Sequence, residues 1–157
     1  MSLDKVKAYF KEAGIESKVI ELEESSATVE LAARALHCEP ARIAKTLSFH
    51  VDDRVVLVVT AGDAKIDNKK YKEEFGQKAK MLSVDEAEPL IGHAVGGVCP
   101  FAVNEGVEVY LDQSMKRFDV VYPAAGSANS AIGLTIPELE IYSKNRKWVD
   151  VCKGWDE

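Results

Sequence analysis

The sequence lacks a long hydrophobic run. Its most apolar stretch, Val55–Ala61, is far shorter than the roughly 20 residues that a membrane-spanning helix needs. The first residues, MSLDKVKAYFKEAG, are charged and amphipathic, without the apolar core and small-residue cleavage site of a secretory signal. We therefore expect a protein with no membrane segment, located in the cytoplasm.

Cysteine is scarce. The three cysteines, Cys38, Cys99 and Cys152, are widely separated and show no C-x-x-C spacing. This pattern indicates free thiols in a reducing compartment and not a disulfide framework. His37 next to Cys38 has no second pair downstream that would complete a tetrahedral zinc site. The sequence predicts neither a metal ion nor a cofactor.

Basic residues do not outnumber acidic ones. The formal net charge of −6 argues against a general nucleic-acid coat, whose affinity comes from many phosphate contacts. One segment, residues 65–80, nevertheless holds six lysines against three carboxylates. We interpret this run as the solvated face of a helix, with a small local basic patch as the alternative.

The composition is that of one globular domain. Of the 157 residues, 46% are hydrophobic and 29% are charged, which separates the chain from disordered and fibrous proteins. This length suits a single core, and no repeat, linker or low-complexity segment divides it. We expect one domain over residues 1–157.

The hydrophobic periodicity predicts helices mixed with strands, without strict alternation. Helices are expected at 3–13, from Thr28 to Pro40, at 67–76, from Ser83 and from Pro137. Strands are expected at 18–22, 44–51, 55–61, 107–111, 118–122, 132–136 and 148–151. The two central strands should form a hairpin, the second buried on both faces. The predicted fold class is α+β, with a mixed, largely antiparallel sheet flanked by helices.

Lys45 is the first candidate for chemistry. The period of two along residues 44–51 places it on the apolar face of a strand, together with Leu47 and Phe49. Its ammonium group must reach water or find an anionic or carbonyl partner, because burying it unpaired is costly. Simple extension to water and a binding role both stay open.

The second candidate is the segment GHAVGGVCPF, residues 92–101. Gly96 and Gly97 would let the backbone approach a ligand and present N–H groups to a developing negative charge, and Pro100 would fix the exit of the turn. A bulge or tight turn is the structural alternative. His93 and Cys99 suggest a thiol hydrolase, although cysteine is also among the most often buried residues.

The third candidate is the small-residue run AAGSANSAI, residues 124–132. Its small side chains leave space, and Ser127, Asn129 and Ser130 can hydrogen-bond a small polar ligand. A polar loop that merely connects two strands is the alternative.

In this order, the three segments resemble the YbaK/prolyl-tRNA synthetase-associated editing-domain family, the aminoacyl-tRNA deacylases. The matching pieces are AKTLSF with Lys45, IGHAVGGVCPF with its G-x-x-x-P signature from Gly96 to Pro100, and AAGSANSAIGLTIPEL. The resemblance covers most of the chain. Relatives commonly have glycine two residues after the proline, where this chain has Ala102.

The resemblance implies a free-standing, metal-independent enzyme that hydrolyses the ester of a small amino acid mischarged on a tRNA, with tRNA for proline as the first candidate. It implies catalytic roles for Lys45, Gly96 and Gly97. Matching positions for substrate binding are Thr46, His93, Val98, Cys99, Pro100, Ser127 and Asn129. The implied partners are the 3′ end of the mischarged tRNA and a prolyl-tRNA synthetase.

Several alternatives stay open at this point. A non-catalytic module that binds a tRNA end or a synthetase would keep the same fold. The amino acid removed is alanine, serine, threonine or cysteine. The oligomeric state is also open, with a homodimer as one candidate.

Overall fold

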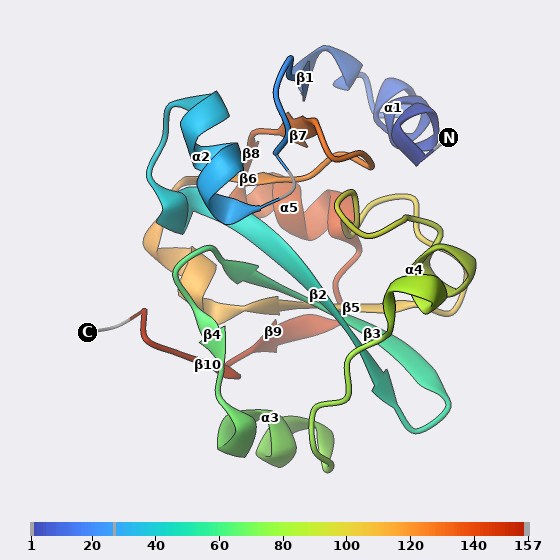
Figure 1. The fold of residues 1–157 in the computed structure, drawn as a ribbon, viewed down its shortest axis with the longest axis vertical. Coiled ribbons are helices and arrows are strands. Elements are labelled where there is room, and N and C mark those ends of the chain that lie inside the picture. The colour runs from blue at the N-terminus through green and yellow to red at the C-terminus, as the bar shows by residue number, and fades with distance from the viewer. Residues whose placement is uncertain (1, 27, 156–157) are drawn as a thin grey trace.

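A mixed six-stranded sheet forms the centre of the molecule (Figure 1), with strand order β8-β6-β2-β3-β5-β9. The computed structural model describes residues 2–26 and 28–155. The strands are β1 Val19–Glu21, β2 Ile43–Val51, β3 Arg54–Ala61, β4 Lys65–Ile66, β5 Glu108–Asp112, β6 Val120–Pro123, β7 Ser130–Ile132, β8 Leu134–Thr135, β9 Lys147–Val149 and β10 Cys152–Lys153. The helices are α1 Ser2–Glu12, α2 Val29–Leu36, α3 Asn68–Phe75, α4 Val84–Ile91 and α5 Ile136–Ser143.

The predicted α+β class with a mixed sheet is confirmed. In the main sheet β2–β3 and β6–β8 are antiparallel, while β2–β6, β3–β5 and β5–β9 are parallel. Two further antiparallel ribbons, β1–β7 and β4–β10, lie beside it. Over the part of the chain that the structure describes, antiparallel pairs therefore exceed parallel pairs by four to three.

The β2–β3 hairpin is the longest pairing in the sheet, and it joins Ala44 with Ala61 at one end and Val51 with Arg54 at the other. Asp52 turns the chain at φ 56°, a conformation that aspartate adopts more readily than most residues. From Leu57 to Ala61 every β3 residue is fully buried. The prediction of a hairpin whose second strand is buried on both faces is confirmed.

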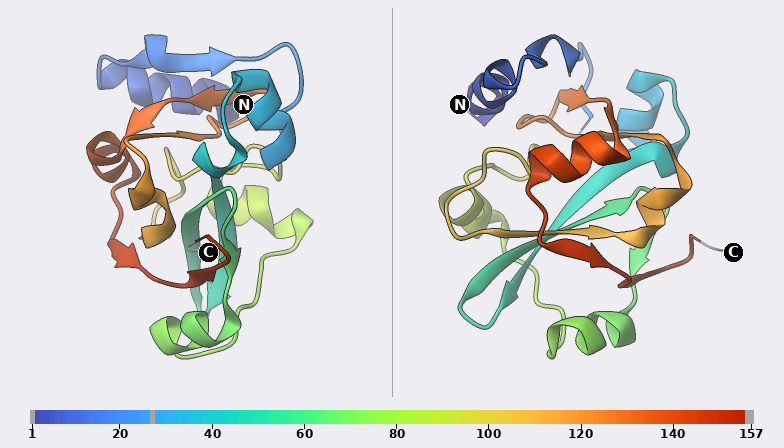
Figure 2. Two further views of the ribbon diagram at one scale, coloured as in Figure 1. Left: turned by 90° about the vertical axis from the view of Figure 1, so that its left-hand side faces the viewer. Right: turned by 180° about the vertical axis from the view of Figure 1, so that it is seen from behind.

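Helices cover the sheet from several directions. Figure 2 shows α5 lying across one side of the sheet, while α1 and the β1–β7 ribbon close one end and α3 the other. The ring of Phe10 on α1 lies 4.9 Å from that of Phe101, centroid to centroid, so α1 packs directly against the segment that follows α4. No helix in the described ranges is both long enough and apolar enough to cross a lipid bilayer.

Two predicted elements end differently in the structure. The strand expected at 132–136 is divided at Gly133, which packs against the Tyr122 ring. As a result β7 pairs with β1 and β8 pairs with β6. The helix expected to run to Pro40 ends at His37, whose left-handed backbone (φ 55°) terminates it, and Pro40 begins a short 3₁₀ turn.

Helix α4 is tied to the hairpin through Glu86. This carboxylate accepts a hydrogen bond from the Ser83 backbone N–H at 2.8 Å and lies 3.0 Å from His50 Nε2. These hydrogen bonds, the backbone one foremost, lower the pKa of Glu86 from its ordinary 4.5 to about 2. Because α4 leads directly into residues 92–101, Glu86 also anchors the glycine-rich segment to β2.

The lowered pKa of Glu86 makes stability depend on pH. Its folded-state pKa lies below the unfolded one, so the stabilisation is complete above pH 4.5 and is lost as the pH falls toward 2. We expect Glu86→Gln to lower the melting temperature at pH 6 and the difference from wild type to shrink steadily below pH 4.5. Glu88→Gln, on the same helix, is the control. A pH-independent difference would contradict this origin.

Candidate functional site

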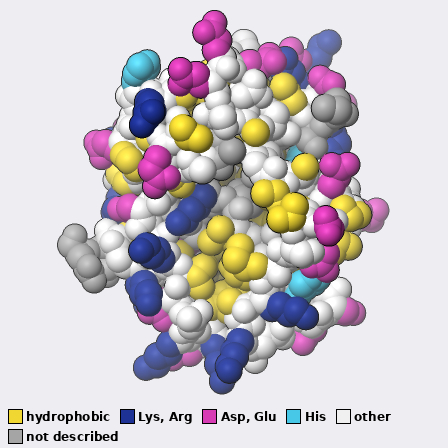
Figure 3. All heavy atoms as spheres, in the orientation of Figure 1, with side chains coloured by type: hydrophobic (Ala, Val, Ile, Leu, Met, Phe, Trp, Pro, Cys, Tyr) yellow, Lys and Arg dark blue, Asp and Glu magenta, His cyan; other side chains and the backbone are white. Residues whose placement is uncertain are grey.

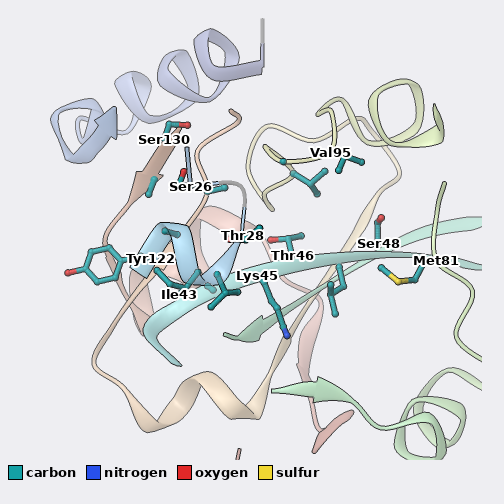
Figure 4. Close-up of a pocket in the computed structure, with 18 of the residues that line it drawn as sticks. Ser26, Thr28, Ile43, Lys45, Thr46, Ser48, Met81, Val95, Tyr122 and Ser130 are labelled. Carbon is teal, nitrogen blue, oxygen red and sulfur yellow. The ribbon is translucent and has the colours of Figure 1, made fainter. Parts of the chain in front are cut away.

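A cavity of about 440 Å³ opens beside β2 (Figure 4), within the roughly 300–1,000 Å³ typical of small-molecule sites. Besides β2, which carries Lys45, four segments far apart in sequence line it: the start of α2, residues 81–84, the glycine-rich segment after α4, and residues 122–131. Polar side chains in its wall include Thr28, Lys45, Thr46 and Ser130. The fold thus brings all three segments singled out in the sequence to one pocket.

The pocket lies at an interruption in the hydrogen bonding along the outer edge of β2. This edge pairs with β6 only at Ile43 and Ala44. Farther along, the Ser48 carbonyl accepts the Leu82 N–H, and the His50 N–H donates to the Lys80 carbonyl. Over residues 45–47 no neighbouring strand among the described residues pairs with this edge. The backbone between the two paired stretches is therefore left open to a ligand.

Lys45 supplies a cation at this open edge. Its ammonium group forms no hydrogen bond or ion pair with any described residue. Burial lowers the pKa of Lys45, while the Cys152 thiol and the Asp63 carboxylate partly oppose that effect. Figure 4 shows the side chains of Lys45 and Thr46 leaving β2 on opposite sides, as strand alternation requires.

Thr46 points toward the segment that carries Val95 (Figure 4). Its Oγ1 is buried and has no hydrogen-bond partner within the described ranges. Because an unsatisfied buried hydroxyl is costly, such groups concentrate where a ligand supplies the missing partner. Thr46 is thus a polar group of the pocket wall that is available to a bound molecule.

The unpaired hydroxyl predicts that Thr46→Val stabilises the protein. Valine keeps the shape of threonine and removes a polar group whose burial costs about 1–3 kcal/mol, so the free energy of unfolding should rise by about 1 kcal/mol. Urea denaturation measures the change. Thr60→Val is the matched control, because the Thr60 hydroxyl donates to the Ala61 carbonyl and its loss should destabilise. A similar loss in both variants would contradict the prediction.

Gly96 and Gly97 have different structural reasons to be glycine. Gly96 adopts φ 96°, in the region that favours glycine. A Cβ on Gly97 would lie 2.6 Å from the Gly126 carbonyl carbon and 2.7 Å from the Ser127 nitrogen. Gly97 therefore lets the glycine-rich segment and the small-residue run pack backbone against backbone.

The backbone N–H groups of Gly96, Gly97 and Val98 also differ in their hydrogen bonding. The Gly97 N–H donates to the Ala94 carbonyl at 3.0 Å. The N–H groups of Gly96 and Val98 have no acceptor among the residues that the structure describes. These two N–H groups, and not that of Gly97, are available to a ligand oxygen. The catalytic role expected for Gly97 stays a prediction, and its observed contribution is the close approach of the two segments.

Close backbone contact predicts that Gly97→Ala separates the two segments. Overpacking of this kind costs about 1–3 kcal/mol in the free energy of unfolding. Hydrogen exchange at the Ala125 amide, which donates to the Ser130 carbonyl, should accelerate as the small-residue run is displaced. The control is Gly14→Ala, where a Cβ meets open space but the φ of 78° makes a side chain costly, so it lowers stability without displacing the small-residue run. Unchanged exchange at Ala125 in Gly97→Ala would contradict the contact.

His93 and Cys99 lie close together but form no activated thiol. Cys99 Sγ is 3.6 Å from His93 Nε2, yet this nitrogen lies 2.7 Å from the Phe101 carbonyl oxygen, to which it must donate a hydrogen. It therefore cannot accept the thiol proton as a base. Burial raises the pKa of Cys99 to about 12, so the thiolate is absent at neutral pH. This arrangement argues against a thiol hydrolase.

The remaining predicted residues are distributed between the pocket and its surroundings. Lys45, Thr46, Gly96 and Val98 line the pocket. His93, Cys99 and Pro100 are buried behind the loop, so any effect they have on a ligand passes through the loop's shape. Their assignment to substrate binding stays a prediction.

Ser127 and Asn129 lie on the other side of the small-residue run. With Gly97 they line a separate hollow next to α1. The Ser127 hydroxyl donates to Asn129 Oδ1 at 3.0 Å, and Asn129 Nδ2 donates to the Leu22 carbonyl. These contacts hold the run in place beside β1. Substrate binding by the two side chains also stays a prediction.

Sequence reasoning missed several residues of the wall. Ser26 and Thr28 come from the start of α2, where the Thr28 side chain accepts the Leu31 N–H as a helix cap. Met81, Val84 and Val95 rim the opening with exposed fractions of 56%, 73% and 57%. The cap was visible in the sequence, but nothing local to it signals a pocket.

Ala102 occupies a backbone conformation that favours glycine. Its φ of 52° lies in the left-handed region, which is costly for a residue with a Cβ. A glycine at this position would adopt it without that cost.

The donor set offers no metal centre. In the described part of the chain, no three or more His, Cys, Asp or Glu side chains are grouped so that they could hold a metal ion. The lone cation and the unsatisfied hydroxyl and N–H groups instead define a site for a polar organic ligand.

The chain belongs to the aminoacyl-tRNA editing domain family, whose model matches residues 23–141. The resemblance found in the sequence is thereby confirmed. Among curated proteins, YwhH of Bacillus subtilis (strain 168), which is uncharacterized, is 53% identical over 157 residues, 99% of this chain and all of that protein. The proline–tRNA ligase of Bacillus cytotoxicus is 31% identical over 88 residues, which are 55% of this chain and 16% of the ligase.

Solved structures agree with this family. A protein described as a proposed trans-editing enzyme for prolyl-tRNA synthetase is 27% identical, with a TM-score of 0.87 over 98% of both chains. The hypothetical protein APE2540 is 26% identical, with a TM-score of 0.84 over 95% of this chain and 99% of the other.

Proposed function

We propose that the protein is a trans-acting deacylase that hydrolyses the ester between a small amino acid and the 3′ end of a mischarged tRNA. The observation that carries the proposal is the open edge of β2, where an unpartnered ammonium, a buried unsatisfied hydroxyl and two unpaired N–H groups meet one cavity. The ligase and trans-editing relatives make tRNA for proline the first candidate and a prolyl-tRNA synthetase the candidate protein partner. The site of action would be the cytoplasm.

The reaction needs little from the protein. Water attacks the ester carbonyl carbon, the bond to the ribose oxygen breaks, and the ribose oxygen recovers a proton as the amino acid leaves as a carboxylate. An ester is already activated, so positioning a water and stabilising the oxyanion would suffice, without a metal ion or a covalent intermediate. The N–H groups of Gly96 and Val98 would stabilise the oxyanion. Lys45 would reach the ester or the terminal nucleotide from the opposite side of β2.

The wall of the pocket suits a small amino acid. Thr28, Thr46, Ser130 and Ala131 contribute short side chains, three of them with hydroxyl groups. A synthetase gains only about 1–3 kcal/mol from one methylene, so it admits smaller or isosteric amino acids that a second site must then remove. Alanine, serine, threonine and cysteine are the candidates.

This proposal predicts that Lys45→Met abolishes most of the activity and leaves the fold intact. Loss of one charge-stabilising group costs about 10²–10³-fold in the rate constant. Stability should change by less than about 0.5 kcal/mol, because the ammonium has no partner to lose. Release of labelled amino acid from tRNA charged with Ala, Ser, Thr or Cys measures the rate. Lys11→Met, an exposed change on α1, is the control.

Two outcomes would contradict the proposal in different ways. Undiminished turnover by Lys45→Met would remove the lysine from the reaction while leaving deacylation in place. Tight binding of all four charged tRNAs by the wild-type protein, with no release, would instead identify a non-catalytic module that binds tRNA ends.

A further inference from the structure

Lysines without ion-pair partners are concentrated on one part of the surface. Among the described residues, six exposed lysines there have side chains with no hydrogen bond or ion pair: Lys65, Lys69, Lys72, Lys78, Lys80 and Lys153. We call this set the lysine arc. Elsewhere on the molecule Lys7, Lys18 and Lys147 each pair with a glutamate. Lys5 donates to the Gly92 carbonyl, and Lys116 and Lys144 lie over the rings of Trp148 and Tyr9, whereas Lys11 on α1 resembles the arc in having no partner among the described residues.

The two ends of the lysine arc adjoin the pocket. At one end, the charge of Lys65 acts on Lys45 and helps to lower its pKa. Lys65 is also the partner of Lys153 in the β4–β10 ribbon. At the other end, Lys80 precedes Met81, which lines the pocket, and its carbonyl accepts the His50 N–H. Helix α3 lies between the two ends (Figure 1).

Figure 3 shows the same arrangement on the surface, where Lys and Arg side chains surround the lower part of an apolar hollow. The lower part of this face, around the hollow, is therefore locally positive, although the whole chain carries a net charge of −6.

An ordinary solvated helix face does not account for this pattern. Such faces are stabilised by opposite charges three or four positions apart. In α3, Lys69 and Glu73 are four positions apart but form no ion pair, and the carboxylate of Glu74 pairs with Lys147 of β9. Among the described residues, the side chains of Lys69 and Lys72 therefore have no partners. These two lysines are three residues apart, so they project from the same side of the helix. Like charges held together repel each other, which favours an anionic ligand.

Building on the proposed deacylase function, we propose that the lysine arc binds phosphates of the acceptor end of the tRNA as its terminal nucleotide enters the pocket. Lysine ammonium groups contact phosphates as point charges without reading sequence. The arc should thus lower KM for every charged amino acid alike and leave kcat unchanged. Phosphates spaced along one strand can follow the row of cations away from the cavity, starting at either end of the arc.

The test compares two double variants with equal charge changes. Lys69→Gln/Lys72→Gln removes two charges from the arc and leaves Lys65 beside Lys45 untouched. Lys11→Gln/Lys144→Gln removes two exposed charges outside the arc. For mischarged tRNA at low salt, the arc variant should raise KM roughly 10-fold at constant kcat, and its slope of log(kcat/KM) against log[salt] should fall by about 1.4, since each lost single-strand phosphate contact contributes about 0.7.

A second substrate distinguishes phosphate binding by the lysine arc from hydrolysis in the pocket. The aminoacyl ester of adenosine, which carries no phosphate, should be hydrolysed equally by the wild type and both variants. If the two variants had equal KM and equal salt slopes on tRNA, phosphate binding by the lysine arc would be overturned. It would also be overturned if the arc variant lost as much kcat/KM on the nucleoside ester as on tRNA. No hydrolysis of either substrate by the wild-type protein would instead refute the deacylase function itself.

Discussion

The structure depends on one interruption in backbone pairing. Strand β2 is held along its inner edge by β3 over residues 44–51, but within the described part of the chain its outer edge has partners only toward its two ends. A β-strand edge with unpaired N–H and C=O groups attracts another chain, and proteins usually cover it. Here the covering segments stop on either side of residues 45–47, so the exposed backbone forms the floor of a pocket of limited width.

The ammonium group of Lys45, at the floor of the pocket, has no counterion among the described residues. Among the carboxylates that act on Lys45, Asp63 has the larger effect, but both oxygens of that carboxylate are held by Arg117, at 2.6 and 2.9 Å. The guanidinium group satisfies the carboxylate in a bidentate pair, which lysine cannot form. An acidic protein can therefore retain a lysine whose charge is directed to a ligand.

Local patterns in the sequence were sufficient for most of the fold. The β2–β3 hairpin follows from period-two alternation before a turn and a continuous apolar run after it, and α3 and α4 follow from their caps at Asp67 and Ser83. The division of the predicted strand 132–136 into β7 and β8 could not be found this way, because it involves the contact of Gly133 with the Tyr122 ring of β6. Propensity describes neighbours along the chain and not contacts across it.

The site was predicted less completely, for the same reason. Lys45 and the glycine–proline segment were identified, and both reach the pocket. The sequence did not reveal the distinct roles of Gly96 and Gly97. The φ of Gly96 and the distance from Gly97 to Gly126 are properties of three-dimensional packing. His93 and Cys99 are indeed near each other, but one hydrogen bond to a backbone carbonyl removes the base that a thiol would need.

The surroundings of the site extend beyond the part of the chain that defines the family. The family model ends at residue 141, whereas the Cys152 thiol that acts on Lys45 belongs to β10. At the other end, Phe10 precedes the matched region and packs on Phe101, the last residue of the glycine-rich segment. A domain excised at the family boundaries would therefore carry the signature residues without the two flanks that brace them, and transplanting the signature alone into another scaffold would transfer an incomplete site.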